Sequence, residues 1–584
     1  MLFHRLCAPA LLIACCIIAS AEAQSDIALK ELAQRYWDAA MLHSPTRATA
    51  LGDYRFNDRL EDLSEEGRKA WKASLRGLLR DLRMVPVAPL CPADRLTRDL
   101  LERTMRDELL RIECLGHYMP LDPLYGLHIR LGLLRVSQPL NTVADFRAYV
   151  SRLRGFSKQV ADAIENMRFG SAIGFISPRV VVERVVPQIR NHLVSDVTQS
   201  VFYVSPEEAA VLGERDRETA VASVGEAIRS DVIPAYLRLL AYVEDEYLPI
   251  TRSTVGLSSL PRGDKIYAAL ARMHTTVRLP TDDIHQLGLD EVARIRKEMA
   301  KVKSEVGFSG DLDAFLAHMR NDPRQRFESG AELLARSREI LARTRPLMAR
   351  LFGRLPKGDC VVKEIERFRQ VSAPVAYYNL APADGARPAY FYVNTYAPTQ
   401  RLRFTLEALT YHEALPGHHL QMALDQENTS LPKFRRYARF TAYEEGWALY
   451  AEKLGYEIGG YTDPYARFGQ LNFEMWRSCR LVVDTGIHAK GWSRQQAIDF
   501  ITTNTSLAPI DIAAEVDRYI TWPGQALAYK IGELRILRLR QEAQEAMGDR
   551  FDLRTFHDAL LGSGAMPVDM LETRMRSWIA GQEG

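Results

Sequence analysis

Apolar residues recur at intervals of three and four along most of this 584-residue chain. The pattern is clearest in residues 28–42, 68–85, 142–167 and 331–352, where charged residues occupy the positions between. This spacing puts the apolar side chains on one face of a helix, so it predicts amphipathic helices that pack on a common core. We therefore expect a mainly α fold.

One region breaks this pattern. Residues 371–398 are rich in Tyr, Val and Phe, and two short extended runs flank the turn-like sequence PADGARP. Such runs around a turn predict a β-hairpin. An exposed edge of this hairpin could pair with an extended peptide through main-chain hydrogen bonds. Ordinary packing of the aromatic side chains, such as Tyr390 and Tyr392, explains the same sequence equally well.

The first 23 residues have the layout of a secretory signal peptide. A basic start, MLFHR, precedes an apolar run, and Ala21 and Ala23 supply an A-x-A cleavage site. Lipidation at Cys15 and retention of the segment as an anchor stay open as alternatives. We expect a periplasmic or secreted protein, with a lipoprotein less favoured. No later run reaches the roughly 18 apolar residues of a span, so no stable membrane insertion is expected after cleavage.

Composition excludes several classes of protein. The formal net charge is +2, so no strong field favours nucleic acid. The chain lacks G-x-x-x-x-G-K-[ST], G-x-S-x-G and G-x-G-x-x-G, the usual motifs of nucleotide binding and serine hydrolases. None of its cysteines forms a C-x-x-C pair, which argues against a cysteine zinc site.

The sequence YHEALPGHHL (411–420) is the strongest chemical signal. His412 and Glu413 lie on an expected helix with a leucine stripe, so both should be partly buried. Buried carboxylate and imidazole groups need a partner, either a divalent cation or a hydrogen-bonded polar network. Metallopeptidase helices usually read H-E-x-x-H, but here the second histidine comes two residues late.

The Pro-Gly pair offers a way to correct that spacing. In an ideal helix His412 and His418 lie about 120° apart around the axis, and His419 lies about 10 Å further along. Pro416 cannot bond the carbonyl of His412, and glycine tolerates unusual backbone angles. We expect a bulged helix turn that brings His418 to a shared metal ion, with His419 as the alternative.

A third ligand is expected from residues 440–459, a mostly apolar helical stretch that carries several glutamates. Glu445 is the first choice and Glu444 the alternative, and Glu452 could support a ligand histidine. Solvated carboxylates at a helix start are the competing interpretation.

Zinc at such a site implies a hydrolytic mechanism. Glu413 would act as general base on a water molecule whose pKa the metal lowers to about 7. His488, oriented by Asp484, and Tyr529 are candidates to stabilise the oxyanion. Arg480 and Arg535 are possible anchors for a substrate carboxylate.

Four motifs together, HEALPGHH, EEGWALYAE, DTGIHAKGWS and PGQALAYKIGELR, resemble the bacterial domain-of-unknown-function family 885. That family is usually grouped with zincin-like metallopeptidases of the gluzincin type. The resemblance implies a large helical fold with a small sheet beside a deep cleft between two helical halves. It also implies His412, Glu413, His418 and Glu445 as the site. A boundary near residue 260 would separate an N-terminal half (24–260) from a catalytic half (261–584).

We therefore expect an exported zinc-dependent hydrolase that cleaves small peptides as an exopeptidase or oligopeptidase. Two alternatives stay open. One is a metal-dependent amidase acting on cell-wall fragments or acylated amino acids. The other is a non-catalytic peptide-binding protein.

Overall fold

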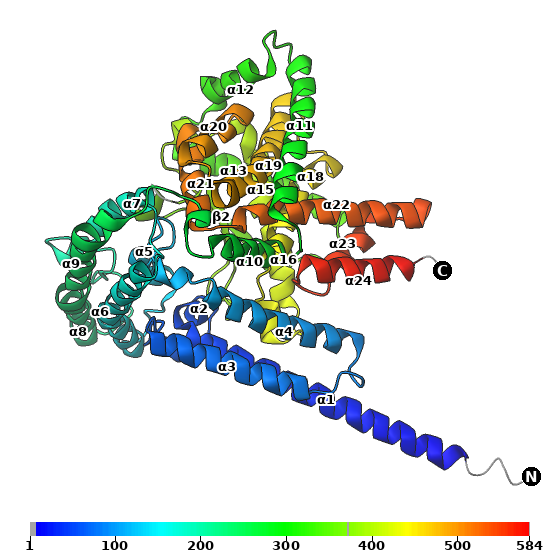
Figure 1. Ribbon diagram of the computed structural model, residues 1–584, viewed down its shortest axis with the longest axis horizontal. Coiled ribbons are helices and arrows are strands. Elements are labelled where there is room, and N and C mark those ends of the chain that lie inside the picture. The colour runs from blue at the N-terminus through cyan, green and yellow to red at the C-terminus, as the bar shows by residue number, and fades with distance from the viewer. Residues whose placement is uncertain (1–6, 371–372, 583–584) are drawn as a thin grey trace, which may run out of the picture.

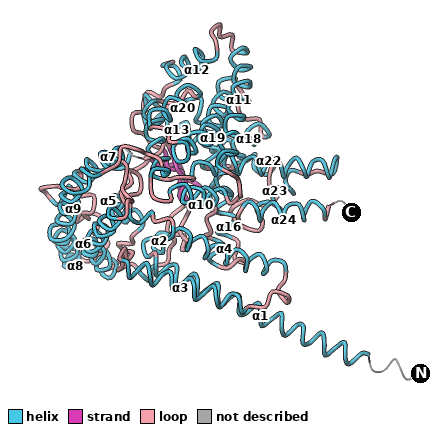
Figure 2. Tube along the Cα trace, in the orientation of Figure 1, coloured by secondary structure: helices cyan, strands magenta, loops and turns pink. Residues whose placement is uncertain are grey.

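The computed structural model describes residues 7–370 and 373–582, and in this part the chain is mainly helical with one small sheet (Figure 1, Figure 2). Residues 1–6 of the expected signal peptide lie outside the described residues, and residues 7–23 continue as the first part of helix α1. None of the described helices combines the length and hydrophobicity that crossing a bilayer requires.

The helices fall into successive groups along the chain. The first group is α1 (Cys7–His43), α2 (Pro45–Ala50), α3 (Glu65–Met84) and α4 (Pro92–Glu113). The second is α5 (Leu127–Ser137), α6 (Val143–Ala172), α7 (Arg179–Arg190), α8 (Glu214–Ala227) and α9 (Ile233–Ala241). The third is α10 (Gly263–Thr275), α11 (Thr281–Glu305), α12 (Leu312–Asn321), α13 (Gly330–Thr344) and the short α14 (Arg367–Gln370).

The remaining helices follow the sheet. They are α15 (Leu406–Glu413), α16 (His418–Glu427), α17 (Lys433–Arg436), α18 (Thr441–Glu457), α19 (Pro464–Lys490), α20 (Arg494–Asn504), α21 (Pro509–Thr521), α22 (Ala528–Met547), α23 (Leu553–Leu561) and α24 (Val568–Ala580). Helices α1, α3, α6 and α13 overlap the four ranges that periodicity predicts, so those predictions are confirmed.

The sheet has three short strands, β1 (Cys360–Glu364), β2 (Ala376–Asn379) and β3 (Ala389–Val393), in the order β1-β3-β2. The expected hairpin is present, because β2 and β3 pair antiparallel with Tyr378 opposite Phe391. Strand β1 was not predicted; it pairs parallel to β3. Phe391 of the central strand β3 is fully buried in the apolar core, so the central strand attaches the sheet to the helices.

Helices α5–α9 have an apolar core of their own, whereas helix α1 packs on a later part of the chain. Helices α5–α9 form a lobe at the left of Figure 1 with its own apolar core, which includes Tyr149, Phe156 and Tyr236. Helix α1 instead packs on the α17 region, where the Trp37 ring lies 5.5 Å from the Tyr437 ring. The expected division near residue 260 stays a prediction.

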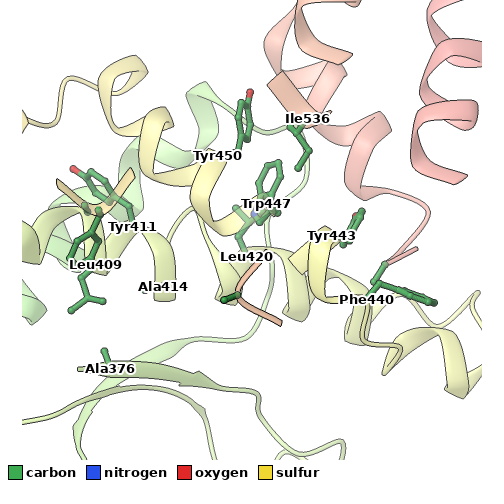
Figure 3. Close-up of a cluster of buried hydrophobic side chains, with 14 of the residues drawn as sticks. Ala376, Leu409, Tyr411, Ala414, Leu420, Phe440, Tyr443, Trp447, Tyr450 and Ile536 are labelled. Atoms are coloured by element: carbon green, nitrogen blue, oxygen red, sulfur yellow. The ribbon is translucent and has the colours of Figure 1, made fainter. Parts of the chain in front are cut away.

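Helix α18 is the central element near the site. Its aromatic residues Tyr443, Trp447 and Tyr450 are buried, and Figure 3 draws them in one cluster with Leu420 of α16 and Ile536 of α22. Helices α18 and α22 also touch backbone to backbone, because Gly446 faces Gly532. A Cβ atom at Gly446 would lie 2.5 Å from the Gly532 Cα atom, so neither position has room for a side chain.

We expect Gly446→Ala to lower the free energy of unfolding by about 1–3 kcal/mol, because the added methyl group must push two packed backbones apart. Urea unfolding followed by circular dichroism measures this change. The matched control is Gly77→Ala in α3, whose new Cβ would meet only the Arg80 guanidinium at 3.7 Å. That change should stabilise the helix by up to about 1 kcal/mol. Equal stability of Gly446→Ala and the wild type would contradict the close contact.

Candidate metal centre

The HEALPGHH segment forms a break between two helices. Helix α15 ends at Glu413, α16 begins at His418, and the Leu415–Pro416 peptide between them is cis. The expectation of one helix with a bulged turn is therefore wrong. Proline lacks the N–H that would continue the helical hydrogen bonds, so the chain leaves α15 and starts a new helix. The Trp447 indole N–H donates to the carbonyls of Pro416 at 3.0 Å and Gly417 at 3.3 Å, which fixes the break.

Gly417 is required here for a reason that the sequence does not reveal. Its φ is −77°, so it does not need the left-handed freedom of glycine. Instead, a Cβ atom at this position would lie 1.9 Å from the carbonyl oxygen of His412. The chain therefore folds back directly onto the end of α15. This fold-back brings the rings of His412 and His418 to 4.9 Å between centroids.

Three side chains from three helices converge at this point. The Nε2 atoms of His412 and His418 lie 3.5 and 3.3 Å from Oε2 of Glu445, and the three residues can offer ligand atoms within 4.8 Å of one another. Two ligands about 2.1 Å from a zinc ion at the tetrahedral angle lie about 3.4 Å apart. The observed spacings match that distance. A His₂Glu set also leaves the fourth zinc position open, as catalytic sites require.

The electrostatics of the site favour a cation. Oε2 of Glu445 is buried and has no hydrogen-bond partner among the described residues. Burial acts to raise the pKa of the Glu445 carboxyl, but the imidazoles of His418 and His412 hold it well below its ordinary value. Burial acts to lower the pKa of His412, but the carboxylates of Glu445 and Glu452 raise it to about 9. Both directions mean that positive charge is stabilised between these groups.

Glu452 orients the first histidine. Its Oε1 accepts a hydrogen bond from Nδ1 of His412 at 2.8 Å, and the carboxylate is fully buried. With the proton on Nδ1, the lone pair of Nε2 points to the shared centre. This is the supporting contact that the sequence predicted for Glu452. Nδ1 of His418 has no such partner within the described part of the chain.

The two alternative ligands point elsewhere. His419 turns towards the sheet, where its Nδ1 lies 3.2 Å from the Tyr378 hydroxyl, and burial lowers its pKa to about 4. Glu444 pairs with Arg439 at 2.9 Å. The structure thus brings together His412, His418 and Glu445, and leaves His419 and Glu444 outside the cluster.

Tyr529 lies beside the cluster, and Glu413 follows the cluster residue His412 directly in the chain. Glu413 is the last residue of α15, next to His412, and it is buried. The Tyr529 ring is nearly parallel to the His412 ring, with 6.3 Å between centroids and 14° between planes. Burial and the negative charge of Glu445 raise the pKa of Tyr529. The Tyr529 hydroxyl accepts a hydrogen bond from the Gln525 amide at 3.4 Å.

His488 does not have the place that the sequence suggested. Its Nδ1 accepts a hydrogen bond from the Leu257 N–H, and its Nε2 donates to the Tyr519 carbonyl. Asp484 accepts from the Tyr267 hydroxyl and the Gly524 N–H, so the expected Asp484–His488 pair is absent from the described contacts. Because both ring nitrogens are engaged by main chain, His488 has no N–H left for an oxyanion. We remove it from the candidate set.

Arginines close to Tyr529 complete the surroundings. The Arg480 guanidinium lies 4.4 Å from the Tyr529 ring centroid, whereas Arg535 pairs with Glu572 of α24. Arg477 and Arg518 were missed by sequence reasoning. Arg477 contacts Glu452 at 3.4 Å, and Arg518 donates to the Gln525 side chain at 3.3 Å. In the sequence, each of these two arginines is marked only as a charged residue within an otherwise apolar helical stretch.

A cavity of about 680 Å³ lies next to this region. It is lined from α3 by Trp71, from the segment before α5 by Tyr125, and from the segment between α21 and α22 by Trp522 and Gln525. Gln525 therefore touches the cavity and also Tyr529. Its size falls within the range of small-molecule sites.

Comparison with known proteins identifies the family. The profile described as "Bacterial protein of unknown function (DUF885)" matches residues 45–575. The chain belongs to the DUF885 family. No curated protein matches it.

Two solved structures are similar to this DUF885 chain. One is a protein from Colwellia psychrerythraea described as a "putative lipoprotein", with 29% identity and a TM-score of 0.88 over 96% of this chain and 100% of that one. The other, from Shewanella oneidensis, is described as a "putative lipoprotein of unknown function". It has 20% identity and a TM-score of 0.69, covers 94% of this chain and 99% of that one, and shows the shared fold alone.

We expect His412→Ala and Glu445→Ala to lose bound zinc, because each change removes one of the three candidate ligands. Inductively coupled plasma mass spectrometry of the purified proteins measures the metal. The matched control is His419→Ala, which changes a buried histidine of the same motif that faces the sheet, and it should keep zinc at the wild-type level. If His419→Ala lost zinc while His412→Ala and Glu445→Ala kept it, His412 and Glu445 would not be the ligands.

Glu452→Gln should keep zinc but bind it about 10–100-fold more weakly, because the amide supports the tautomer of His412 less well than a carboxylate does. Competition with a calibrated chelator measures the affinity. The control is Glu457→Gln, further along the same helix, where the carboxylate pairs with Arg540 at the surface. Equal zinc affinity of Glu452→Gln and Glu457→Gln would rule out the supporting role.

Proposed function

We propose that the protein is an exported zinc-dependent hydrolase with a zincin-like site of the gluzincin type, which cleaves peptide bonds of small peptides. The observation that carries this proposal is the convergence of two histidines and one glutamate at spacings that fit tetrahedral zinc. The buried Oε2 atom of Glu445 adds to it, because it accepts no hydrogen bond among the described residues and has only the two imidazoles as neighbours of opposite charge, a setting that suits a cation.

The residues around the cluster suit hydrolysis. A zinc ion held there would supply Lewis acidity towards a water molecule and the peptide carbonyl. Glu413, next to a ligand but not itself one of the three, would take the proton from the attacking water and deliver it to the leaving amine. Tyr529 lies beside His412 and would donate its hydroxyl proton in a hydrogen bond to the carbonyl oxygen as negative charge grows there.

Three further observations support the substrate size and the location. The neighbouring cavity of about 680 Å³ is bounded by residues of both the N-terminal helices and the α21–α22 segment, which suits a short peptide better than a folded protein. The N-terminal sequence has the order of charges, apolar residues and small residues of an export signal. The similar structures described as lipoproteins agree with export or membrane attachment.

Glu413→Gln should lower kcat on a cleaved peptide by about 10²–10⁴-fold with zinc retained, because it removes the proton acceptor and leaves the ligands in place. A panel of blocked tripeptides, with metal content measured on the same samples, tests this. Glu444→Gln is the matched control, since it changes a buried glutamate beside Glu445 that pairs with Arg439. An unchanged biological activity of zinc-loaded Glu413→Gln would favour a peptide-binding protein instead.

A further inference from the structure

Three arginines surround Tyr529, and together we call them the arginine cluster: Arg477 and Arg480 of α19 and Arg518 of α21. Arg477 and Arg480 are buried, with side chains 4% and 1% exposed, and the Arg518 side chain is 11% exposed. The Arg480 guanidinium lies 4.1 Å from the Trp476 ring centroid and 4.4 Å from that of Tyr529. The two aromatic rings fix the position of the Arg480 guanidinium, as is common for arginines that bind a ligand.

The direct contacts of the cluster pair three guanidinium groups with two carboxylates, and Glu445 lies near enough to act on Arg477 and Arg518. Arg480 and Arg518 share one carboxylate, that of Glu515, with N–O distances of 2.9 and 3.4 Å. Arg477 reaches Glu452 at 3.4 Å, but that carboxylate also serves His412. The nearby Arg401–Asp511 pair is balanced within itself. These carboxylates do not use all the N–H groups of the three guanidinium groups, so donors remain for an additional anion.

Unused hydrogen-bond donors point the same way. Nη1 of Arg480 and Nε of Arg477 and Arg518 are buried and have no partner among the described residues. Buried N–H groups normally find an acceptor, and an Arg fork matches the two oxygens of a carboxylate. Backbone carbonyls in contact would have satisfied these donors without adding charge. The cluster instead keeps free N–H donors on permanently charged guanidinium groups.

The cluster lies between the candidate metal centre and the cavity. Tyr529 contacts Arg480 and also lies nearly parallel to the ring of the zinc ligand His412. Arg518 donates to the Gln525 side chain, and Gln525 lines the cavity. A substrate that enters from the cavity would therefore meet the arginines within one or two residues of the metal, since successive Cα atoms are about 3.8 Å apart.

We propose that Arg480 and Arg518 bind the free α-carboxylate on the leaving side of the substrate. The proposal rests on the proposed hydrolase function and names its substrate class: short peptides or acylated amino acids cut next to a C-terminal residue. The metal centre would then hold the scissile bond on the amino side of that residue, and the arginines would hold its α-carboxylate. An amino-terminal ammonium group has only donors and cannot accept a hydrogen bond from these N–H groups, so aminopeptidase action is disfavoured.

The direct test compares an N-acetyl tripeptide with its C-terminal amide, because the scissile bond and all side chains are the same in both. The wild type should cleave the free acid with a kcat/KM about 100-fold higher, the effect of a charge-assisted hydrogen bond. Equal rates on the acid and the amide would overturn the proposal while leaving the hydrolase function intact.

Variants assign the effect to the cluster. Arg518→Gln should lower the ratio of kcat/KM on the acid to kcat/KM on the amide by about 100-fold. Arg480→Lys keeps the charge but loses the planar fork, so it should show a smaller loss on the acid alone. Arg535→Gln, which changes an arginine paired with Glu572, is the control and should leave both rates at wild-type values. Equal losses on acid and amide would overturn the assignment.

Binding separates failure of this inference from failure of the hydrolase proposal. Isothermal titration of zinc-loaded Glu413→Gln with the same two peptides should give tighter binding of the acid, by a similar factor. If the wild type cleaves neither peptide but this preference is present and disappears with Arg518→Gln, the anchor stands and the hydrolase proposal fails. If the acid is neither cleaved nor bound better than the amide, the anchor is overturned as well.

Discussion

The fold-back of the chain at Gly417 is the constraint on which the candidate site depends. Without a side chain at this residue, the backbone can lie against the His412 carbonyl and start a second helix immediately. The two histidines then come from different helices, and the order of residues along one helix no longer limits their spacing. The indole N–H of Trp447, a buried residue of α18, donates hydrogen bonds to the carbonyls of this turn. The same helix carries Glu445, so core packing and ligand placement share one element.

Much of this arrangement is visible in the sequence, because periodicity and residue type carry it. The long helices and the hairpin follow from apolar spacing, and the grouping of His412, His418 and Glu445 follows from residue types that bind metals. The form of the helix break could not be predicted. It depends on how closely Gly417 approaches a carbonyl, and no spacing rule contains that distance. Strand β1 was missed because its sequence, CVVKE, contains none of the aromatic residues that mark β2 and β3.

Other differences arise where a helix is buried on every side. Helix α19 is such a helix, so its spacing does not tell which neighbour each polar residue meets. Asp484 and His488 lie four residues apart, yet they bond to different segments of the chain. Arg518 looks like an exposed charge on an amphipathic helix. Only the fold shows that it is buried beside Gln525 and shares Glu515 with Arg480.

The contact between Gly446 and Gly532 has a mechanical consequence. Glu445 directly precedes Gly446, and Tyr529 lies one helical turn before Gly532. The close contact of the two glycines therefore holds the candidate ligand Glu445 and Tyr529 rigidly relative to each other. Under the proposed function, motion that admits a peptide would fall to the helices of the first part of the chain that border the cavity. Selection for new substrates would accordingly act on those upstream helices, and the paired glycines would stay untouched.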